Sequence, residues 1–68
     1  MFDEKVDQLS LTEHTVTFTI RCNRAAACIA EALTFNGLGF TLTTRYDETT
    51  NEWNFVAPRH ALGTLRTL

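Results

Sequence analysis

The hydrophobic period of the chain changes twice within 68 residues, and this change restricts the folds open to it. Residues 15–21 alternate apolar and polar side chains, which is typical of a β-strand with one covered face. Residues 23–36 switch to helical spacing, and residues 40–46 return to alternation. The pattern therefore predicts a strand, a helix and a strand in that order.

The first predicted strand has one apolar and one polar face. We expect Val16, Phe18 and Ile20 to point toward the helix, because successive side chains of a strand lie on opposite faces. The other face carries threonine at positions 15, 17 and 19, a β-branched residue that suits the open face of a sheet.

The predicted helix over residues 23–36 is rich in alanine, the residue with the highest helix propensity. We expect the side chain of Asn23 to cap its first turn. Gly37 is expected to end it in the left-handed conformation. The buried stripe of the helix is predicted to consist of Ala25, Cys28, Ile29, Ala32 and Leu33.

A hairpin is predicted after the helix, with a strand at 40–46, a polar turn at 47–51 and a returning strand at 52–57. A strand–helix–strand crossover runs its two strands parallel, so the returning strand can lie between them and be antiparallel to both. Pro58 ends this strand. In the strand 40–46, the side chains predicted to face the core are Phe40, Leu42 and Tyr46, and those predicted to face outward are Thr41, Thr43 and Arg45.

Residues 2–11 allow two interpretations. The apolar spacing from Phe2 to Leu9 fits a short amphipathic helix. Leu9 and Leu11 instead alternate, as in a strand that turns back into residues 15–21. We favour the hairpin because the strand 15–21 needs a neighbour.

Together these elements predict one α+β domain over residues 1–68, with a sheet of three or four strands, antiparallel or mixed, and one α-helix on one face. The order is β-α-β-β, with an extra N-terminal strand in the hairpin interpretation. The C-terminal apolar spacing predicts one or two helical turns over a sheet edge, at Ala61, Leu62, Leu65 and Leu68. A chain this short is near the lower size limit for a core without staples or partners.

The composition, 44% hydrophobic and 21% charged, is that of a folded protein rather than a disordered one. No apolar run approaches the ~20 residues that cross a membrane. The N-terminus lacks the order of a signal peptide, so we expect a cytoplasmic protein with no membrane partner. Cys22 and Cys28 are expected to be reduced and mostly buried.

The sequence contains no recognisable catalytic constellation. Ser10 is the only serine and lies outside any nucleophile elbow. Gly37 and Gly39 lack the further glycine and the helix of a phosphate loop. His14 and His60 are isolated and do not have zinc-finger spacing with the cysteines. We therefore expect no enzyme, no metal site and no cofactor.

An aromatic and acidic cluster is predicted at the turn of the second hairpin. Tyr46 and Trp53 lie across the hairpin from each other, and Asp47, Glu48 and Glu52 surround them. Aromatic residues are common hot spots of protein interfaces. Carboxylates around them direct such a patch toward a basic surface.

The main functional hypothesis is therefore a small non-catalytic protein-binding module. Its hairpin at 46–53 would cover a basic surface of another protein, such as a nucleic-acid groove. In size and topology alone, the chain is similar to acidic inhibitors of host machinery encoded by phages. An inhibitor carried by a phage or mobile element is the finer form of this hypothesis.

The alternative is a protein that binds single-stranded nucleic acid on the open face of the sheet. Trp53 and Phe55 decide the character of that face, because outward rings would form a platform on which bases stack. We favour Phe55 in the core and Trp53 at the sheet margin, since so small a core needs its aromatic residues. The polar residues of this alternative site are Thr17, Thr19, Arg21, Thr43 and Arg45.

A third hypothesis is a small structural or accessory subunit that dimerises. An unpaired strand edge, within residues 9–21 or 40–46, invites pairing with a second copy. A chain with little core also gains stability from a partner. A homodimer is therefore a further expectation.

Overall fold

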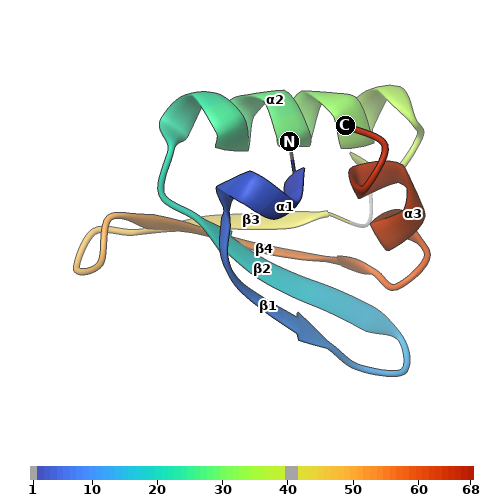
Figure 1. The fold of residues 1–68 in the computed structure, drawn as a ribbon, viewed down its shortest axis with the longest axis horizontal. Coiled ribbons are helices and arrows are strands. Elements are labelled where there is room, and N and C mark those ends of the chain that lie inside the picture. The colour runs from blue at the N-terminus through green and yellow to red at the C-terminus, as the bar shows by residue number, and fades with distance from the viewer. Residues whose placement is uncertain (1, 40–41) are drawn as a thin grey trace.

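The computed structural model describes residues 2–39 and 42–68, and it shows one four-stranded antiparallel sheet with a helix on one face (Figure 1). The strand order across the sheet is β1-β2-β4-β3. In chain order the elements are α1 (Phe2–Lys5), β1 (Val6–Leu11), β2 (Thr15–Ile20), α2 (Asn23–Phe35), β3 (Thr43–Asp47), β4 (Glu52–Pro58) and α3 (Ala61–Leu65). The predicted α+β class is confirmed, and the N-terminal strand is present.

Two stacked phenylalanine rings form the centre of the core. The register of β2 and β4 places Phe18 opposite Phe55, with ring centroids 4.9 Å apart and ring planes 8° apart. Phe2 of α1 meets the Phe18 ring edge-on at 5.1 Å. Such aromatic pairs contribute about 0.5–1.5 kcal/mol beyond the burial of their area. Val16 and Ile20 are also fully buried, so the predicted inward face of β2 is confirmed.

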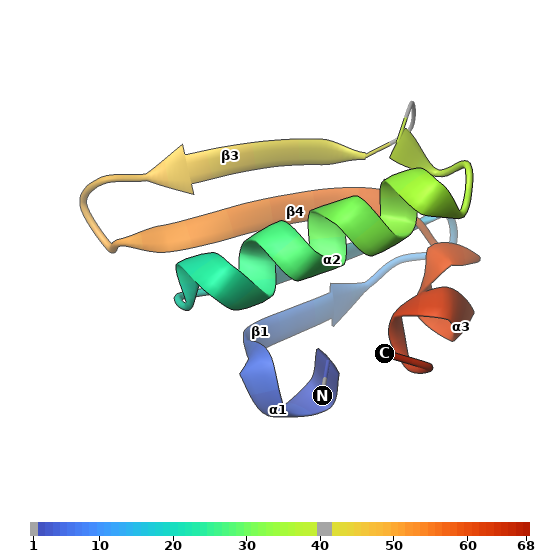
Figure 2. The ribbon, with the colours of Figure 1, turned by 90° about the horizontal axis from the view of Figure 1, so that it is seen from above.

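α2 lies along the central strands and buries Ile29 and Leu33 completely (Figure 2). The helix ends in a Schellman motif, in which the N–H of Leu38 donates to the carbonyl of Leu33 at 2.9 Å and that of Gly37 to the carbonyl of Thr34 at 3.0 Å. Gly37 has a φ of +76°, a conformation that strains residues with a Cβ atom. The predicted role of Gly37 is confirmed.

The start of α2 differs from the prediction. Cys22 occupies the N-cap position, its side chain makes no capping hydrogen bond, and the helix begins at Asn23. A side chain caps a helix from the residue before the first helical one. Asn23 lies one position too late for this role, and its Oδ1 instead accepts a hydrogen bond from Nε1 of Trp53 at 2.7 Å.

Cys22 and Cys28 are free thiols, as predicted, but the predicted burial is wrong because both are exposed. Cys28 follows Arg24 by four residues and precedes Glu31 by three, so these three side chains share the solvent face of α2. Ala25 belongs to the buried stripe as predicted, Ala26 takes the place of Cys28 in it, and Ala32 is only partly buried.

The second hairpin has the predicted topology, with β4 between β2 and β3 and antiparallel to both. Thr43 and Arg45 lie on the face away from α2, as predicted. Tyr46 lies on the helix side of the sheet but is 40% exposed, so it belongs to the margin of the core rather than to its interior. Leu42 packs against the core, whereas the predictions for Phe40 and Thr41 concern residues outside the described ranges.

The N-terminal segment combines both interpretations, because the single helical turn of α1 precedes the strand β1. The C-terminal helix α3 packs against α2 and β4, on the β1 side of α2 (Figure 2). An ion pair between Asp3 and Arg66, at 3.9 Å, joins the two terminal elements. The described helices include none that is long and apolar enough to span a membrane.

One helix covers only the middle of this sheet (Figure 2). Strands lie about 4.8 Å apart, so four of them present a face roughly 15–20 Å wide, whereas a helix is about 10–12 Å across. α1 and α3 flank α2 on the side of β1, while β3 lies uncovered on the other side (Figure 2). The inner faces of both edge strands remain partly exposed, at Leu9 (38%), Leu11 (42%) and Tyr46 (40%).

Truncation of a buried and of an exposed phenylalanine should change the free energy of unfolding by different amounts. Phe18→Ala removes a ring that is 1% exposed and stacked on Phe55, and we expect it to lower the free energy of unfolding by about 3–5 kcal/mol. The same change at Phe35, which is 82% exposed, should alter it by less than about 0.5 kcal/mol. Urea unfolding followed by circular dichroism measures both. Equal losses in the two variants would contradict the packing described above.

Candidate functional site

The β3–β4 hairpin projects beyond the end of α2 and forms one extremity of the molecule (Figure 1). Side-chain contacts fix its turn. Oδ1 of Asp47 accepts a hydrogen bond from the N–H of Thr49 at 2.9 Å, and the hydroxyl of Tyr46 donates to Oδ1 of Asn51 at 3.0 Å. Asn51 has a φ of +57°, the left-handed conformation that asparagine tolerates best among residues with a Cβ atom. The hairpin is therefore an ordered projection.

Tyr46 and Trp53 form an aromatic pair at the base of this projection. They are direct cross-strand partners, with ring centroids 5.0 Å apart and planes inclined by 55°. The hydrogen bond from Trp53 to Asn23 ties the pair to the first residue of α2. Trp53 is half-buried, and the more exposed ring of Tyr46 is the one available to a partner.

The three predicted carboxylates do not surround this aromatic pair. Asp47 and Glu52 are direct cross-strand partners and lie on the opposite face of the sheet, because they are the immediate neighbours of Tyr46 and Trp53 in each strand. Glu48 is exposed within the turn. The structure thus brings the aromatic residues together on one face and Asp47 and Glu52 together on the other, with Glu48 at the tip.

Two hollows flank the hairpin. On the helix side, an apolar groove of about 210 Å³ lies between α2 and β3, and it is lined by Ala26, Ala27, Ala30, Thr44, Trp53 and Phe55. On the open side, a shallow depression of about 640 Å³ is lined by Arg45, Tyr46, Asp47, Glu48 and Asn54. The sequence analysis did not identify the groove, although alanines at 26, 27 and 30 were a sign of small side chains beside the sheet.

Over the described residues, the open face of the sheet is mostly polar and lacks the aromatic platform of the nucleic-acid alternative. Trp53 and Phe55 are cross-strand partners of buried Ile20 and Phe18, so both rings lie on the helix side. Nε of Arg21 lies 3.7 Å from Oε2 of Glu52, and a second carboxylate, that of Asp7, is 3.8 Å away. The positive charge of this arginine is therefore offset by two carboxylates.

The remaining polar residues of the alternative site line the open face in register. Thr17 pairs with Val56, which pairs with Thr43, and Thr19 pairs with Asn54, which pairs with Arg45. Thr19 is buried, and its hydroxyl finds no hydrogen-bond partner among the described residues.

The described ranges contain no group of three or more His, Cys, Asp or Glu side chains that could hold a metal ion. His14 lies in the β1–β2 turn with Nε2 4.0 Å from Oε2 of Glu13, and both side chains are exposed. Such a solvated pair has no enclosed pocket in which to act as an acid or base on a substrate.

The Cys22 thiol lies at the N-terminus of α2. The backbone N–H groups of Ala25 and, to a smaller extent, Arg24 lower the pKa of this thiol, because their partial positive charges stabilise the thiolate. Desolvation acts in the opposite direction, and the charges of Lys5 and Arg24 add to the lowering. The thiol of Cys22 is consequently more readily ionised in the folded chain than in the unfolded one.

The link between α2 and the hairpin can be tested through Trp53, the only tryptophan. Asn23→Ala removes the acceptor of its indole N–H, and we expect the emission maximum of Trp53 to shift to the red as water replaces that bond. Asn23→Asp keeps an oxygen acceptor at the same position and should retain the wild-type spectrum. An unchanged spectrum in the alanine variant would show that Asn23 does not hold the ring.

The lowered pKa of Cys22 predicts faster alkylation in the folded state. In a Cys28→Ser variant, the rate of reaction with iodoacetamide should rise with pH at a lower midpoint in buffer than in urea, because only the folded helix stabilises the thiolate. Mass spectrometry over a pH series measures both curves. Coincident curves would contradict the electrostatic effect of the helix terminus.

Comparisons of the chain with protein-family models, with curated proteins and with solved structures found no match.

Proposed function

We propose that this chain is a non-catalytic protein-binding module that docks its β3–β4 hairpin on a basic surface of another protein. The observation that carries the proposal is the ordered projection of this hairpin, with Tyr46 exposed on one face and carboxylates at the tip and on the other face.

Order in the free hairpin favours binding because less conformational entropy is lost on association. Each strand of the projection has its own fixing contact. The Tyr46 hydroxyl is bound by Asn51, the Asp47 carboxylate holds the turn through Thr49, and the Trp53 ring is held by Asn23. The partner thus meets a surface that is already in its binding shape.

The charge of the hairpin specifies the kind of partner. Residues 47–52 contain three carboxylates and no basic residue, so the tip is negatively charged at Asp47 and Glu48, whereas Glu52 is paired with Arg21. Complementary potentials raise association rates and select among partners, more than they raise affinity. A cationic surface with a recess for an aromatic ring fits both features of the hairpin.

The finer form of the proposal is an inhibitor acting in the cytoplasm, carried by a phage or mobile element. A basic surface is commonly the surface on which a protein binds nucleic acid. An acidic projection seated there would block that substrate without any catalytic step.

Single-stranded nucleic-acid binding remains the alternative, and the structure offers it less support. Both aromatic rings of β4 face α2, and Arg21 is offset by carboxylates. If the alternative held, the emission of Trp53 would change on addition of single-stranded DNA or RNA at low salt and recover at high salt. The protein-binding proposal expects no such change.

A charge reversal at the tip tests the proposal. Glu48→Lys should reduce the capture of a protein partner from lysate of the source cells by roughly five- to tenfold, because it replaces an attractive rim charge by a repulsive one. Glu13→Lys is the matched control, since it makes the same change at an exposed residue in the other turn. Quantitative mass spectrometry of the captured proteins measures the effect.

The salt dependence provides the second criterion. Capture by the wild type should weaken as ionic strength rises. The difference in capture between the wild type and Glu48→Lys should become smaller over the same range. A partner captured equally by the wild type and by Glu48→Lys would exclude the hairpin as its binding site. Equal loss in the Glu13→Lys control would show a general effect of net charge instead.

A further inference from the structure

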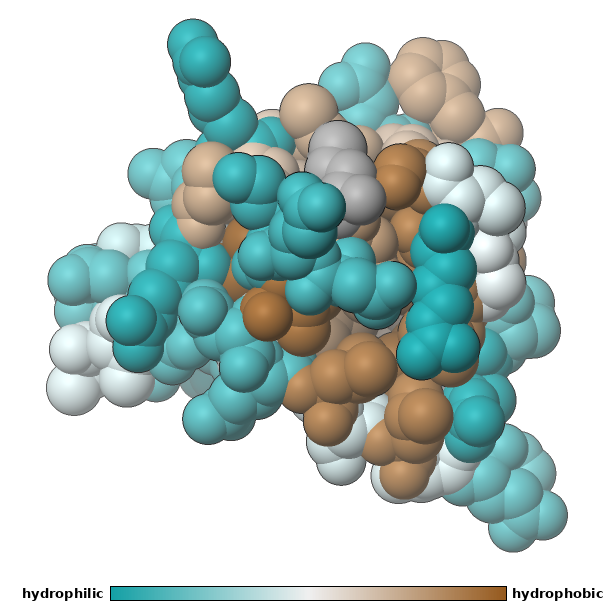
Figure 3. Space-filling model, in the orientation of Figure 1, coloured by the Kyte–Doolittle hydropathy of each residue, from teal (hydrophilic) through white to brown (hydrophobic). Residues whose placement is uncertain are grey.

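The β1 edge of the sheet is an unpaired strand with an apolar inner side. Among the strands that the structure describes, β1 has β2 as its single neighbour. Leu9 and Leu11 lie opposite buried Phe18 and Val16, hence on the α2 side, and are only partly covered. Figure 3 shows hydrophobic side chains gathered over β1 in the lower part of the view. The edge thus combines free backbone groups with exposed leucines.

The backbone groups of these leucines point to the open edge. The N–H of Thr12 donates to the carbonyl of Thr15 at 2.9 Å, which makes Thr12 and Thr15 a hydrogen-bonded pair. In an antiparallel ladder such pairs alternate with pairs whose N–H and C=O groups point away from each other. By this alternation Ser10 is bonded to β2, whereas Leu9 and Leu11 direct their backbone groups outward.

This edge carries little protection against pairing. Natural edge strands are blunted by charged side chains, proline or bulges. β1 has a bulge between Val6 and Gln8, and α1 and α3 lie near its two ends on the α2 side (Figure 2), but residues 8–11 contain no charge and no proline. The other edge strand, β3, carries Arg45 and Asp47. Of the two edges, β1 is therefore the one suited to an uncharged strand.

We propose that β1 pairs antiparallel with β1 of a second copy, about a twofold axis at Ser10. In this register Leu9 of each copy lies opposite Leu11 of the other, and the outward backbone groups of all four leucines are satisfied. The axis is perpendicular to the sheet, so both copies keep α2 on the same side and the four leucines form one apolar cluster. A register centred on Leu9 would instead set Leu11 opposite Asp7.

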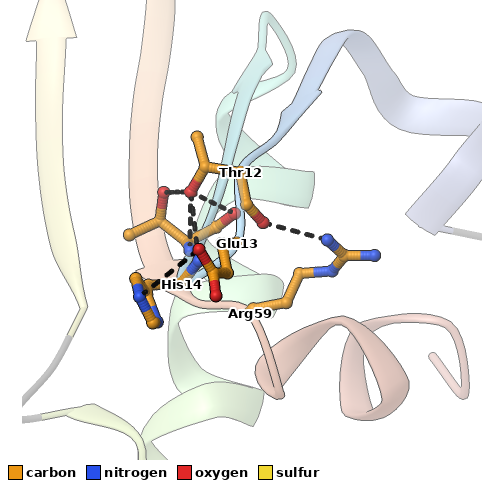
Figure 4. Close-up of polar contacts among 5 residues, drawn as sticks. Thr12, Glu13, His14 and Arg59 are labelled. Carbon is orange, nitrogen blue, oxygen red and sulfur yellow. Dashed lines mark hydrogen bonds and ion pairs between the residues drawn. The ribbon is translucent and has the colours of Figure 1, made fainter.

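In this register Asp7 of one copy lies opposite Glu13 of the other, and arginines at this end offset the repulsion between the two carboxylates. Asp7 of one copy approaches the β1–β2 turn of the other. There Nη1 of Arg59 donates to the carbonyl of Thr12 at 2.9 Å, which holds a guanidinium at the turn (Figure 4). Glu13 lies in the same turn, and Arg21 is 3.8 Å from Asp7. Asp7 thus has Arg21 beside it, and Arg59 holds a positive charge in the turn that carries Glu13.

This inference stands apart from the proposed function. β1 and β3 are opposite edges of the sheet, so pairing through β1 leaves both β3–β4 hairpins free at the two ends of an eight-stranded sheet. Loss of partner binding in a hairpin variant does not affect the dimer, and loss of the dimer does not remove the hairpin.

The oligomeric state tests the proposal first. In sedimentation equilibrium, the mass of the wild type should rise from 7.7 kDa toward twice that value between about 10 µM and about 1 mM. The double variant Leu9→Lys, Leu11→Lys should stay monomeric over this range. Its dimer dissociation constant should be at least about tenfold higher than that of the wild type, because lysines on an edge repel a second copy. Val56→Lys is the control at a side chain that is also 38% exposed, and it should dimerise as the wild type does.

A disulfide test identifies the register without removing a leucine. In a Cys22→Ser, Cys28→Ser background, Ser10→Cys places two thiols across the axis on a pair whose Cα atoms lie about 4.5 Å apart, within the range of a disulfide. Gln8→Cys is the control, since its two copies would lie roughly 14 Å apart. We expect a covalent dimer from the first variant and not from the second under mild oxidation.

The outcomes decide the proposal. A wild-type chain that stays at 7.7 kDa at the highest concentration overturns it, as does a lysine double variant that dimerises like the wild type. Equal cross-linking of Ser10→Cys and Gln8→Cys overturns the register. A dimer lost in Val56→Lys and kept in the double variant would assign the contact to the open face of the sheet instead.

Discussion

One long helix of 13 residues, with only the short α1 and α3 beside it, has to cover a sheet of four strands, and most features of this molecule follow from that mismatch. α2 is placed over β2 and β4, where Phe18 stacks on Phe55, because burial of these rings contributes the most free energy per residue. The two strands outside this core are left with partly exposed inner faces. In a larger protein a second helix would cover them. Here they are the surfaces on which a partner can add burial.

The two uncovered edges have different chemistry and therefore different uses. β3 continues into a projecting turn with carboxylates, which suits a basic partner surface. β1 presents uncharged residues over 8–11 and outward backbone groups at Leu9 and Leu11, which suits another strand. A dimer through β1 would hold two hairpins at a fixed spacing. Two linked sites raise the effective concentration of the second once the first is bound, so a modest affinity per hairpin would suffice.

The sequence predicted the parts of the fold that depend on periodicity and on backbone chemistry. The alternation at Val16, Phe18 and Ile20 identified the inner face of β2, and Gly37 marked the end of α2. The crossover makes β2 and β3 parallel, and this direction allowed the prediction that β4 lies between them and is antiparallel to both. These features are local or topological, and they depend little on which residues finally meet.

The sequence predicted the candidate site less well, because its residues are distributed by register and by the reach of α2. Clustering along the chain suggested carboxylates around Trp53, but a strand sends neighbouring side chains to opposite faces, which separates Glu52 from it. Asn23 is a residue type that commonly caps helices, but the helix begins one residue earlier than this role requires. The side chain of Asn23 therefore accepts a hydrogen bond from the indole of Trp53 instead of capping the helix. That hydrogen bond joins residues 30 apart, and it couples the helix that covers the core to the hairpin that leaves it. Any displacement of α2 over the sheet would therefore move the aromatic pair. The packing of the core and the shape of the proposed binding surface are thus coupled.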